Sequence, residues 1–340
     1  MSARKRPNAR ATINDVADVA GVSRGTVSRV LNSEIYVSDA AKKAVEAAIA
    51  QVGYVRNTAA HNLVTRQSHA IGLIVHEPHS LFLEDPNIGS ILLGTNSVLS
   101  DADYQLVSLV IDSDRDTQRV ARYLTGGFVD GVIIISARAN DPIARAVADI
   151  GIPAAFVGHP ADIEGIPYVG IDNLAAATAI TERLIATGRK KIGMIAAGLD
   201  RDSGLDRVAG FTAALGARFD PSLVVEVPLY SHGSGIEGMR ELLRRSPDVD
   251  GVFAASDSIA AGVLDVLREV GRAVPSEVGV VGFDDSAWAK RTQPPLSTVR
   301  QPAELLGRGA AESVLAQIRG EAFETAGTLL ETSIVWRDSA

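Results

Sequence analysis

The chain has 340 residues, of which 46% are hydrophobic and only 5% aromatic, so it can form two or three domains with cores of Val, Ile, Leu and Ala. Cysteine is absent, which excludes a disulfide framework, a thiolate nucleophile and a zinc site with cysteine ligands. The net charge of −8 argues against nucleic-acid binding if the chain is treated as a whole.

The charge is unevenly distributed along the chain. Residues 1–66 contain ten basic and five acidic residues, a net charge of +5, whereas the remainder carries −13. This asymmetry predicts a basic DNA-contacting module on an acidic body, and a solvated basic tail is the alternative. Residues 1–10 are expected to form a disordered basic arm, which serves either electrostatic attraction to DNA or solubility.

The N-terminal segment MSARKRPNAR is basic, but no apolar run of signal-peptide length follows it. No stretch approaches the roughly 18 consecutive apolar residues of a membrane span. We therefore expect a cytoplasmic protein.

Residues 12–32, TINDVADVAGVSRGTVSRVLN, have the pattern of two short helices joined by a tight turn. Thr12 is a candidate N-cap with Asp15 three residues later, and apolar residues follow at helical spacing. Gly21 suits a turn with positive φ, and Ser23 can cap the second helix. Guanidinium, hydroxyl and amide groups on the outer face of that helix are the groups that contact base edges and phosphates in a major groove. The predicted outward residues are Arg24, Gly25, Thr26, Ser28, Arg29 and Asn32. A helical hairpin with an ordinary polar face is the alternative.

A third helix is predicted between Ser38, its candidate N-cap, and Gly53, because apolar residues repeat there at helical spacing. Residues 57–66, NTAAHNLVTR, are then predicted to form a short, weak helix. Its large apolar residues are Leu63 and Val64.

The run ATINDVADVAGVSRGTVSRVLN, followed by VSDAAKKAVEAAIAQVGYVRNTAAHNL, closely resembles the headpiece of the LacI/GalR family of bacterial transcription regulators. The resemblance implies a helix-turn-helix headpiece at 11–56 and a hinge at 57–68 that orders on operator DNA. It also implies that Leu63 wedges into a minor-groove step, and a plain linker with an incidental leucine is the alternative. The expected DNA-contacting residues are Thr12, Ser23, Arg24, Thr26, Ser28, Arg29, Asn32, Ser38, Asn57, Ala60 and Leu63. Because Gly25 offers no side chain to a base, sequence preference is expected to depend on Arg24, Arg29 and groove shape.

From residue 70 onward the pattern changes to apolar strands that alternate with helices, which is typical of parallel sheets. A first set of strands is predicted at 70–75, 104–110, 130–135 and 153–157. A second set is predicted at 168–172, 191–197, 223–227, 250–256 and 278–283, with helices that begin near Asn173, Ser203, Gly235, Asp257 and Gln301. Two such lobes, with loops from their strand ends in a shared crevice, can form a ligand-binding clamp.

This region resembles the type I periplasmic-binding-protein core of the same family. The expected fold is therefore an all-α helix-turn-helix headpiece followed by a two-lobed α/β core. The resemblance implies three crossings between the lobes, near residues 170, 300 and 327. The first lobe is expected to contain residues 69–170 and 301–327, and the second lobe residues 171–300 and 328–340.

Several polar residues follow strands of the second set, at the sheet edge where a crevice ligand is expected. Arg207 lies near the start of a predicted helix, and Asp257 and Asp284 follow strands. An arginine fork with carboxylates suits a polyhydroxylated ligand, because charged hydrogen bonds to hydroxyls are strong. Tyr230 can offer its ring to the C–H side of a sugar. The candidate effector-binding residues are Arg207, Asp257, Asp284, Tyr230, Ser136 and His76, and a helix cap or an interlobe ion pair is the alternative role.

In the family, the positions that match Arg207, Asp284, Tyr230 and the pair Ser256 and Asp257 commonly line the effector pocket. Some sugar-responsive members have a carboxylate in the first lobe, where this chain has Val157, Gly158 and His159. The effector is therefore expected to differ from simple galactosides.

Residues 233–238, GSGIEG, match the G-x-G-x-x-G pattern of dinucleotide sites, and Asp257 lies about 20 residues downstream. However, residues 228–232 separate the glycines from the preceding strand, so nicotinamide binding is a minor alternative. The sequence contains no nucleophile elbow, P-loop or H-E-x-x-H motif, and its six histidines lack metal-ligand spacing.

We therefore predict a sequence-specific DNA-binding regulator, not an enzyme, without metal or cofactor. The leading interpretation is a repressor that binds a palindromic operator as a homodimer and is controlled by a sugar-like effector with different affinities for its two states. A transport or chemoreception binding protein shares the core, but predicts a signal peptide and no headpiece. An enzyme with a DNA-binding head, an activator and a tetramer are further alternatives.

Overall fold

The computed structural model describes residues 11–31, 36–54, 67–158, 163, 165–321 and 327–340. It divides into two compact units, Met1–Gln67 and Ser68–Ala340. The described part of the first unit contains helices α1 (Ile13–Ala20), α2 (Arg24–Leu31) and α3 (Asp39–Val52).

The ends of α1 and α2 have the predicted caps. Thr12 and Asp15 form a capping box, in which each side chain accepts a hydrogen bond from the backbone N–H of the other residue. Gly21 ends α1 with a φ of 64°, a conformation that costs glycine little. Ser23 Oγ accepts a hydrogen bond of 3.1 Å from the N–H of Thr26 at the start of α2. Apolar residues from all three helices form the core of this unit: Val16, Ala17, Val27, Val45 and Ala48.

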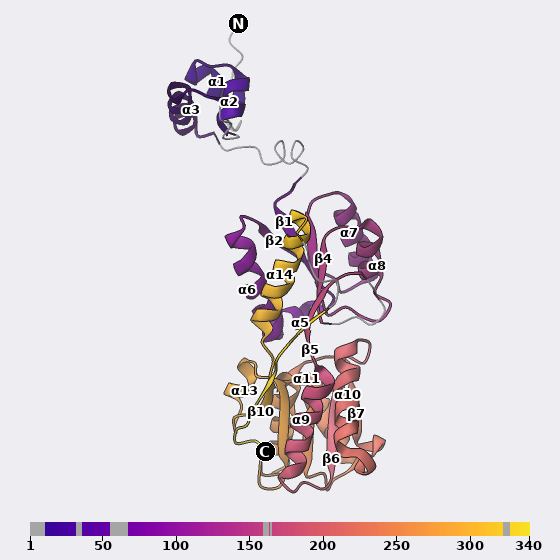
Figure 1. Cartoon of the computed structure of the whole chain (residues 1–340). Coiled ribbons are helices and arrows are strands. Elements are labelled where there is room, and N and C mark those ends of the chain that lie inside the picture. The colour runs from indigo at the N-terminus through magenta and orange to yellow at the C-terminus, as the bar shows by residue number, and fades with distance from the viewer. Residues whose placement is uncertain (1–10, 32–35, 55–66, 159–162, 164, 322–326) are drawn as a thin grey trace. The chain divides into compact units, whose positions relative to one another are not determined.

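The first lobe of the second unit is built on a parallel sheet with the strand order β11-β5-β4-β3-β1-β2. Its strands are β1 (Ala70–Val75), β2 (Gln105–Val110), β3 (Gly131–Ile135), β4 (Ala154–Val157), β5 (Tyr168–Ile171) and β11 (Thr328–Leu330). Helices α6 (Pro86–Asp101) and α14 (Ala303–Arg319) pack against one face of the sheet, and α7 (Asp114–Thr125) and α8 (Pro142–Ile150) against the other (Figure 1). The short helix α5 (His79–Glu84) precedes α6.

The second lobe is built on a sheet with the strand order β12-β10-β9-β8-β6-β7. Its strands are β6 (Ile192–Ala197), β7 (Val224–Val227), β8 (Gly251–Ala254), β9 (Gly279–Asp284), β10 (Ser297–Arg300) and β12 (Ser333–Val335). All are parallel to their neighbours except β12, which is antiparallel to β10. The helices of this lobe are α9 (Asn173–Ala186), α10 (Asp202–Leu215), α11 (His232–Arg245), α12 (Asp257–Glu269) and α13 (Ala287–Arg291), with the short helices η1 (Gly216–Arg218) and η2 (Pro221–Leu223).

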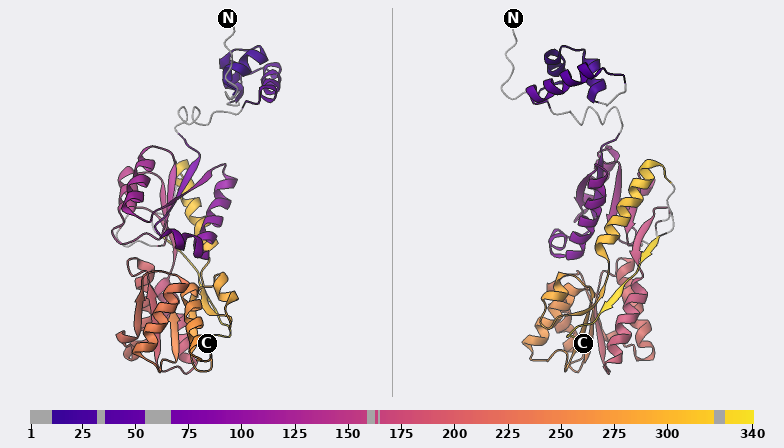
Figure 2. Two further views of the ribbon diagram at one scale, coloured as in Figure 1. Left: turned by 180° about the vertical axis from the view of Figure 1, so that it is seen from behind. Right: turned by 60° about the vertical axis from the view of Figure 1, so that its left-hand side comes forward.

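Within the described residues, the chain crosses between the two sheets three times. Strand β5 leads into α9 of the second lobe, β10 leads into α14 of the first lobe, and β11 leads into β12. Because β11 pairs with β5, the last crossing lies between residues 330 and 333, a few residues after the boundary at 327 that the sequence indicates. Figures 1 and 2 show these segments passing between the lobes.

The glycine-rich segment at 233–238 lies inside a helix. Helix α11 begins at His232, three residues earlier than predicted, with Ser231 as its N-cap. A Cβ atom on Gly235 would lie 2.1 Å from the carbonyl oxygen of Ile259, so this glycine allows the backbones of α11 and α12 to approach closely. Close packing against α12 therefore accounts for Gly235, and a Cβ atom on Gly238 would lie 2.6 Å from the side chain of Ile195 in β6, whereas Gly233 meets open space.

Among the residues that the structure describes, we find no helix with the length and apolar character needed to cross a membrane.

Candidate functional site

The outer face of α2 carries the residues that the sequence predicts to contact DNA. Arg24 and Arg29 are exposed, whereas Val27 between them is fully buried. The hydroxyl oxygens of Ser23 and Thr26 lie 2.9 Å apart and share a hydrogen bond. The other outward positions are Gly25, which is exposed, and Ser28, which is partly exposed. This face of α2 thus presents two guanidinium groups, and hydroxyl groups are concentrated at the start of the helix.

Two further predicted DNA contacts cap the helices on either side of α2. Thr12 caps α1, and Ser38 Oγ caps α3 by accepting a hydrogen bond of 3.3 Å from the N–H of Ala41. The first N–H groups of a helix attract anions, so both positions are compatible with contacts to DNA phosphates. The remaining predicted contacts lie outside the described residues: Asn32, Asn57, Ala60 and Leu63.

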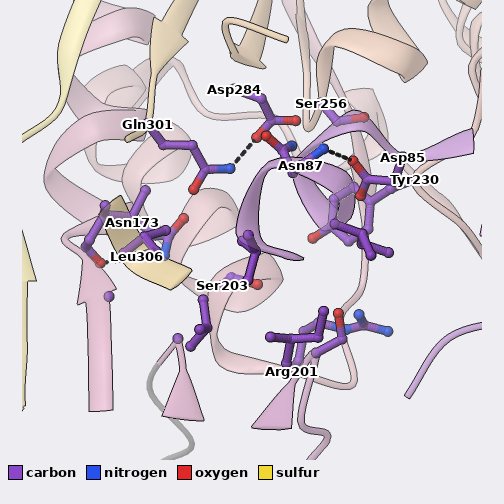
Figure 3. A pocket seen from close by; sticks show the side chains of 18 of the residues that line it. Asp85, Asn87, Asn173, Arg201, Ser203, Tyr230, Ser256, Asp284, Gln301 and Leu306 are labelled. Carbon is purple, nitrogen blue, oxygen red and sulfur yellow. Dashed lines mark hydrogen bonds between the residues drawn. The ribbon is translucent and has the colours of Figure 1, made fainter. Parts of the chain in front are cut away.

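A cavity of about 950 Å³, including its open mouth, lies between the two lobes of the second unit (Figure 3). We call it the effector cavity. Its apolar lining includes side chains of α6, β3, β5 and α14, and its polar lining comes from both lobes. The polar lining residues are Glu77, Asp85, Asn87, Ser136, Asn173, Arg201, Asp202, Ser203, Arg207, Tyr230, Ser256, Asp284 and Gln301. A concave site with an apolar surface and converging polar groups is typical of small-molecule binding.

Arg207 is held rigidly in the wall of this cavity. It lies on α10 and is only 6% exposed. Its Nε donates to Asn173 Oδ1 at 3.0 Å, and its Nη1 donates to the carbonyl oxygen of Ala255 at 2.6 Å. The guanidinium carbon lies 3.7 Å from the ring centroid of Phe283, and Nη2 lies 3.9 Å from Asp284 Oδ1. A planar, fixed guanidinium is suited to directional hydrogen bonds with ligand oxygens.

Asp284 ends β9 beside Arg207. Its Oδ1 accepts a hydrogen bond of 2.6 Å from Gln301 Nε2, and its φ of 119° is unusual for a residue with a side chain (Figure 3). Burial raises the pKa of Asp284 to about 7, although the charge of Arg207 opposes the rise. Near neutral pH this carboxyl group can therefore either accept or donate a hydrogen bond to a ligand hydroxyl.

Asp85 contributes a second perturbed carboxyl group, from the first lobe. It is the N-cap of α6, and its Oδ1 accepts a hydrogen bond of 2.8 Å from the N–H of Asn87 (Figure 3). Burial raises its pKa to about 6; the Asn87 N–H opposes this rise, and the nearby Glu77 carboxylate adds to it.

Tyr230 lines the cavity, and its hydroxyl donates to the carbonyl oxygen of Ala197 at 2.9 Å. The guanidinium carbons of Arg201 and Arg207 lie 5.9 Å and 5.8 Å from the centroid of this ring. Arg201 Nη1 in turn donates to Glu77 Oε1, which joins the second lobe to the first by a buried ion pair.

The structure brings four of the six predicted effector-binding residues together in this cavity: Arg207, Asp284, Tyr230 and Ser136. Asp257 does not line it. Its side chain is fully buried and accepts hydrogen bonds from the N–H of Ser286 at 2.7 Å and from Thr298 Oγ1 at 2.6 Å. Asp257 therefore anchors the loop after β9 to β10, and its neighbour Ser256 faces the cavity instead.

His76 also lies outside the effector cavity. Its Nδ1 is 2.7 Å from Asp141 Oδ2, and the residue lines a separate cavity at the edge of the cleft. The adjacent residue, Glu77, faces the effector cavity.

Eight polar residues of the lining were not predicted from the sequence: Glu77, Asp85, Asn87, Asn173, Arg201, Asp202, Ser203 and Gln301. One signal was available, because an aspartate before a proline is a common start of a helix, and Asp85 precedes Pro86 in this way. The first lobe thus supplies two carboxyl groups to the cavity, although the segment around Gly158 offers none. In the described part of the chain, no three His, Cys, Asp or Glu side chains are grouped so that they could hold a metal ion.

Comparison with known proteins agrees with this architecture. Residues 12–57 match the family model described as "Bacterial regulatory proteins, lacI family", and residues 181–340 match "Periplasmic binding protein-like domain". The chain is 41% identical over 344 aligned positions to the HTH-type transcriptional regulator CelR of Thermobifida fusca, with full coverage of both chains. It is 32% identical to the HTH-type transcriptional regulator RegA of Clostridium saccharobutylicum, over 96% of this chain and 98% of that protein.

Solved structures of two regulators resemble nearly the whole chain. A complex of the transcriptional regulator CelR with cellobiose is 39% identical, covers 97% of this chain and 100% of the other, and has a TM-score of 0.78. The lac repressor dimer bound to operator and the anti-inducer ONPF is 27% identical, covers 97% and 99% of the two chains, and has a TM-score of 0.86. With its helix-turn-helix unit and its two-lobed periplasmic-binding-protein-like core, the chain belongs to the LacI family of bacterial transcriptional regulators.

Proposed function

We propose that this regulator is a non-catalytic repressor that binds a two-fold symmetric operator as a dimer and is released by a neutral sugar in the effector cavity. The observation that carries the proposal is the polar lining of the effector cavity, which comes from both lobes and includes the ion pair between Arg201 and Glu77. A ligand there contacts both lobes at once, so its affinity depends on how the lobes are arranged.

The charges of the lining favour a neutral ligand. Glu77, Asp85, Asp202 and Asp284 supply carboxyl groups, and Arg201 and Arg207 supply guanidinium groups. The raised pKa values of Asp85, about 6, and Asp284, about 7, reduce the negative charge of the lining near neutral pH, so an anion is disfavoured and a cation gains little, whereas hydroxyl groups can both donate and accept hydrogen bonds. The ring of Tyr230 and the apolar lining suit the C–H faces of a pyranose. Cellobiose, bound in the CelR structure, is therefore the first candidate effector.

The DNA-binding role rests on the exposed face of α2. A single helix face with two arginines and a glycine makes few base contacts. In a dimer the second protomer supplies a second headpiece, which binds the other half-site of a two-fold operator. We propose a headpiece at 11–56 and a hinge at 57–68 as the parts that act on DNA, and the two lobes as the part that binds the effector, with the last crossing between residues 330 and 333. The proposed DNA contacts are Thr12, Ser23, Arg24, Thr26, Ser28, Arg29, Asn32, Ser38, Asn57, Ala60 and Leu63.

The test uses the full-length protein and an operator selected from random DNA. Fluorescence anisotropy should give a Kd for this operator that rises at least tenfold when cellobiose is added, while cellobiose itself remains unhydrolysed. A reporter promoter that overlaps the operator should be silenced by the protein.

The variant Asp284→Ala should bind the operator but no longer respond to cellobiose. The exposed Glu269, which pairs with Arg240 at 2.9 Å and does not line the cavity, offers a matched control as Glu269→Ala. An operator affinity that cellobiose and a panel of other neutral sugars leave unchanged, or turnover of the sugar, would contradict the proposal.

A further inference from the structure

A second cavity lies at the edge of the cleft, and we call it the outer cavity. Residues from both lobes line it, among them His76, Asp112, Arg138, Asp200, Arg201 and Glu226. It follows the ends of β2 and β7, the outermost strands of their sheets. The crossing strands β5, β11, β10 and β12 lie at the opposite edges, so the outer cavity is at the side of the cleft farthest from the crossings.

Arg201 lines both the outer cavity and the effector cavity. Its ion pair with Glu77 therefore stands where the two cavities meet. On the outer side, Arg201 Nε lies 3.1 Å from Asp200 Oδ1, and Arg138 Nε of the first lobe lies 3.2 Å from Asp200 Oδ2. Charged groups of both lobes thus form ion pairs between the two cavities. When the lobes separate, hydrogen bonds to solvent or to a ligand must replace these ion pairs.

The hydrogen-bonding capacity of the Glu77 carboxylate is not fully used at this junction of the two cavities. The residue is 3% exposed, and its Oε2 has no hydrogen-bond partner in the described part of the chain. A buried carboxylate oxygen without a partner carries a desolvation penalty that a hydroxyl donor removes. The junction of the two cavities therefore lacks a hydrogen-bond donor, which a ligand hydroxyl can supply.

The outer cavity has the mixed surface of a sugar site. Its apolar parts include Pro78, Pro228 and Leu229, which can pack against the C–H face of a pyranose. Its charged parts include an excess of carboxylates over guanidinium groups, which disfavours anionic ligands such as sugar phosphates.

We propose that the outer cavity is a second sugar subsite, so that the preferred effector is a neutral oligosaccharide of three or more units. One end of the oligosaccharide occupies the effector cavity, its chain passes between Glu77 and Arg201, and its further units lie in the outer cavity. The ion pair between Glu77 and Arg201 opens when the oligosaccharide binds: a ligand hydroxyl near the junction donates to Glu77, and Arg201 donates to an oxygen of the oligosaccharide in place of Glu77. This inference rests on the proposed sugar response of the effector cavity.

Isothermal titration of the full-length protein with cellobiose, cellotriose and cellotetraose tests the proposal. We expect the Kd to fall at least tenfold between cellobiose and cellotetraose. The substitution Glu226→Trp fills the outer cavity from an exposed position on the edge strand β7, where an aromatic residue is tolerated. It should abolish this gain and leave the Kd for cellobiose within twofold of wild type.

Ser108→Trp is the matched control, because Ser108 is exposed on the edge strand β2 and does not line either cavity. This variant should retain the tenfold gain. Equal Kd values for the three sugars in the wild-type protein, or a gain that persists in Glu226→Trp, would overturn the outer subsite. If Glu226→Trp is unstable, the Kd values of the wild-type protein for the three sugars test the outer subsite by themselves. If the protein binds none of the three sugars, both the outer subsite and the sugar response are overturned. If it binds them without an effect of chain length, only the outer subsite is overturned.

Discussion

The pKa of Asp85 predicts how the stability of the core depends on pH. In the folded protein, burial and the nearby Glu77 raise this pKa from the ordinary value of 3.8 to about 6, against the opposing hydrogen bond from Asn87. Between these two values the unfolded chain loses the proton first, so the folded state binds more protons. The free energy of unfolding therefore falls as the pH rises from about 4 to about 6, and the full penalty is present above that range.

The substitution Asp85→Asn isolates this effect, because asparagine is as good an N-cap as aspartate but carries no charge. A rise of the pKa from 3.8 to about 6 corresponds to about 3 kcal/mol. We expect the variant to match wild type near pH 4 and to be more stable by up to about 3 kcal/mol at pH 7.5. For a core of this length that difference raises the Tm by roughly 5 °C.

Thermal unfolding followed by circular dichroism at pH values from 4 to 8 measures the difference. Asp220→Asn is the control, since Asp220 is likewise an N-cap, of the short helix η2. Asp220 is exposed, however, and hydrogen bonds from Ser222 lower its pKa. The control should show no gain in stability at pH 7.5. A difference between Asp85→Asn and wild type that is constant with pH, or a less stable variant at pH 7.5, would refute the reasoning.

Three further substitutions, one of them with a matched control, test the cavity wall, the helix packing and the headpiece. Arg207→Leu leaves the buried Asp284 without its cation and should lower the free energy of unfolding by about 3–5 kcal/mol, measured by urea denaturation, whereas a loss below 1 kcal/mol would show that the guanidinium is not structural. Gly235→Ala forces a Cβ against the α12 backbone and should cost about 1–3 kcal/mol by the same assay. Gly233→Ala on the same helix meets open space and should stabilise by up to about 1 kcal/mol; equal effects of the two would contradict the packing role. Thr12→Ala removes the capping box and should speed hydrogen exchange of the α1 amides in the full chain about fivefold, a change corresponding to about 1 kcal/mol, and unchanged exchange would argue against the cap.

The alternation of apolar strands and helices was sufficient to predict the two-lobed core, because parallel strands buried on both faces leave nearly continuous apolar runs. It also located Arg207 and Asp284, since residues that follow parallel strands gather at one edge of the sheet. Their placement in one cavity follows from topology, and topology is what the strand and helix pattern encodes.

The two misplaced residues show what this pattern does not encode. His76 was predicted to bind the effector, but the next residue, Glu77, faces the cavity; similarly, Asp257 is buried while the preceding Ser256 faces the cavity. Neighbouring residues at a strand end point to opposite sides, so an error of one position exchanges a ligand contact for a structural one. Which neighbour faces inward depends on partners distant in sequence, such as Thr298 for Asp257.

Gln301 illustrates a different reason for failure. It lies between β10 and α14 on a crossing segment, and its side chain reaches Asp284 only because the crossing places it there. An isolated glutamine in a loop has no sequence signature, whereas Asp85 could have been identified from its position before Pro86 at a helix start.

Control of DNA binding requires an effector to discriminate between two arrangements of the lobes. A shift from 1:99 to 99:1 needs a difference in binding free energy of about 5.5 kcal/mol. Hydrogen bonds to charged groups contribute about 1.5–3 kcal/mol each, so two to four such bonds made in only one arrangement are sufficient. Glu77 and Asp85 on the first lobe, and Arg201, Arg207 and Asp284 on the second, provide this number of charged groups around one cavity. The energetic requirement is therefore met by contacts that span the lobes, and a ligand that touched one lobe alone would bind both arrangements equally and leave the equilibrium unchanged.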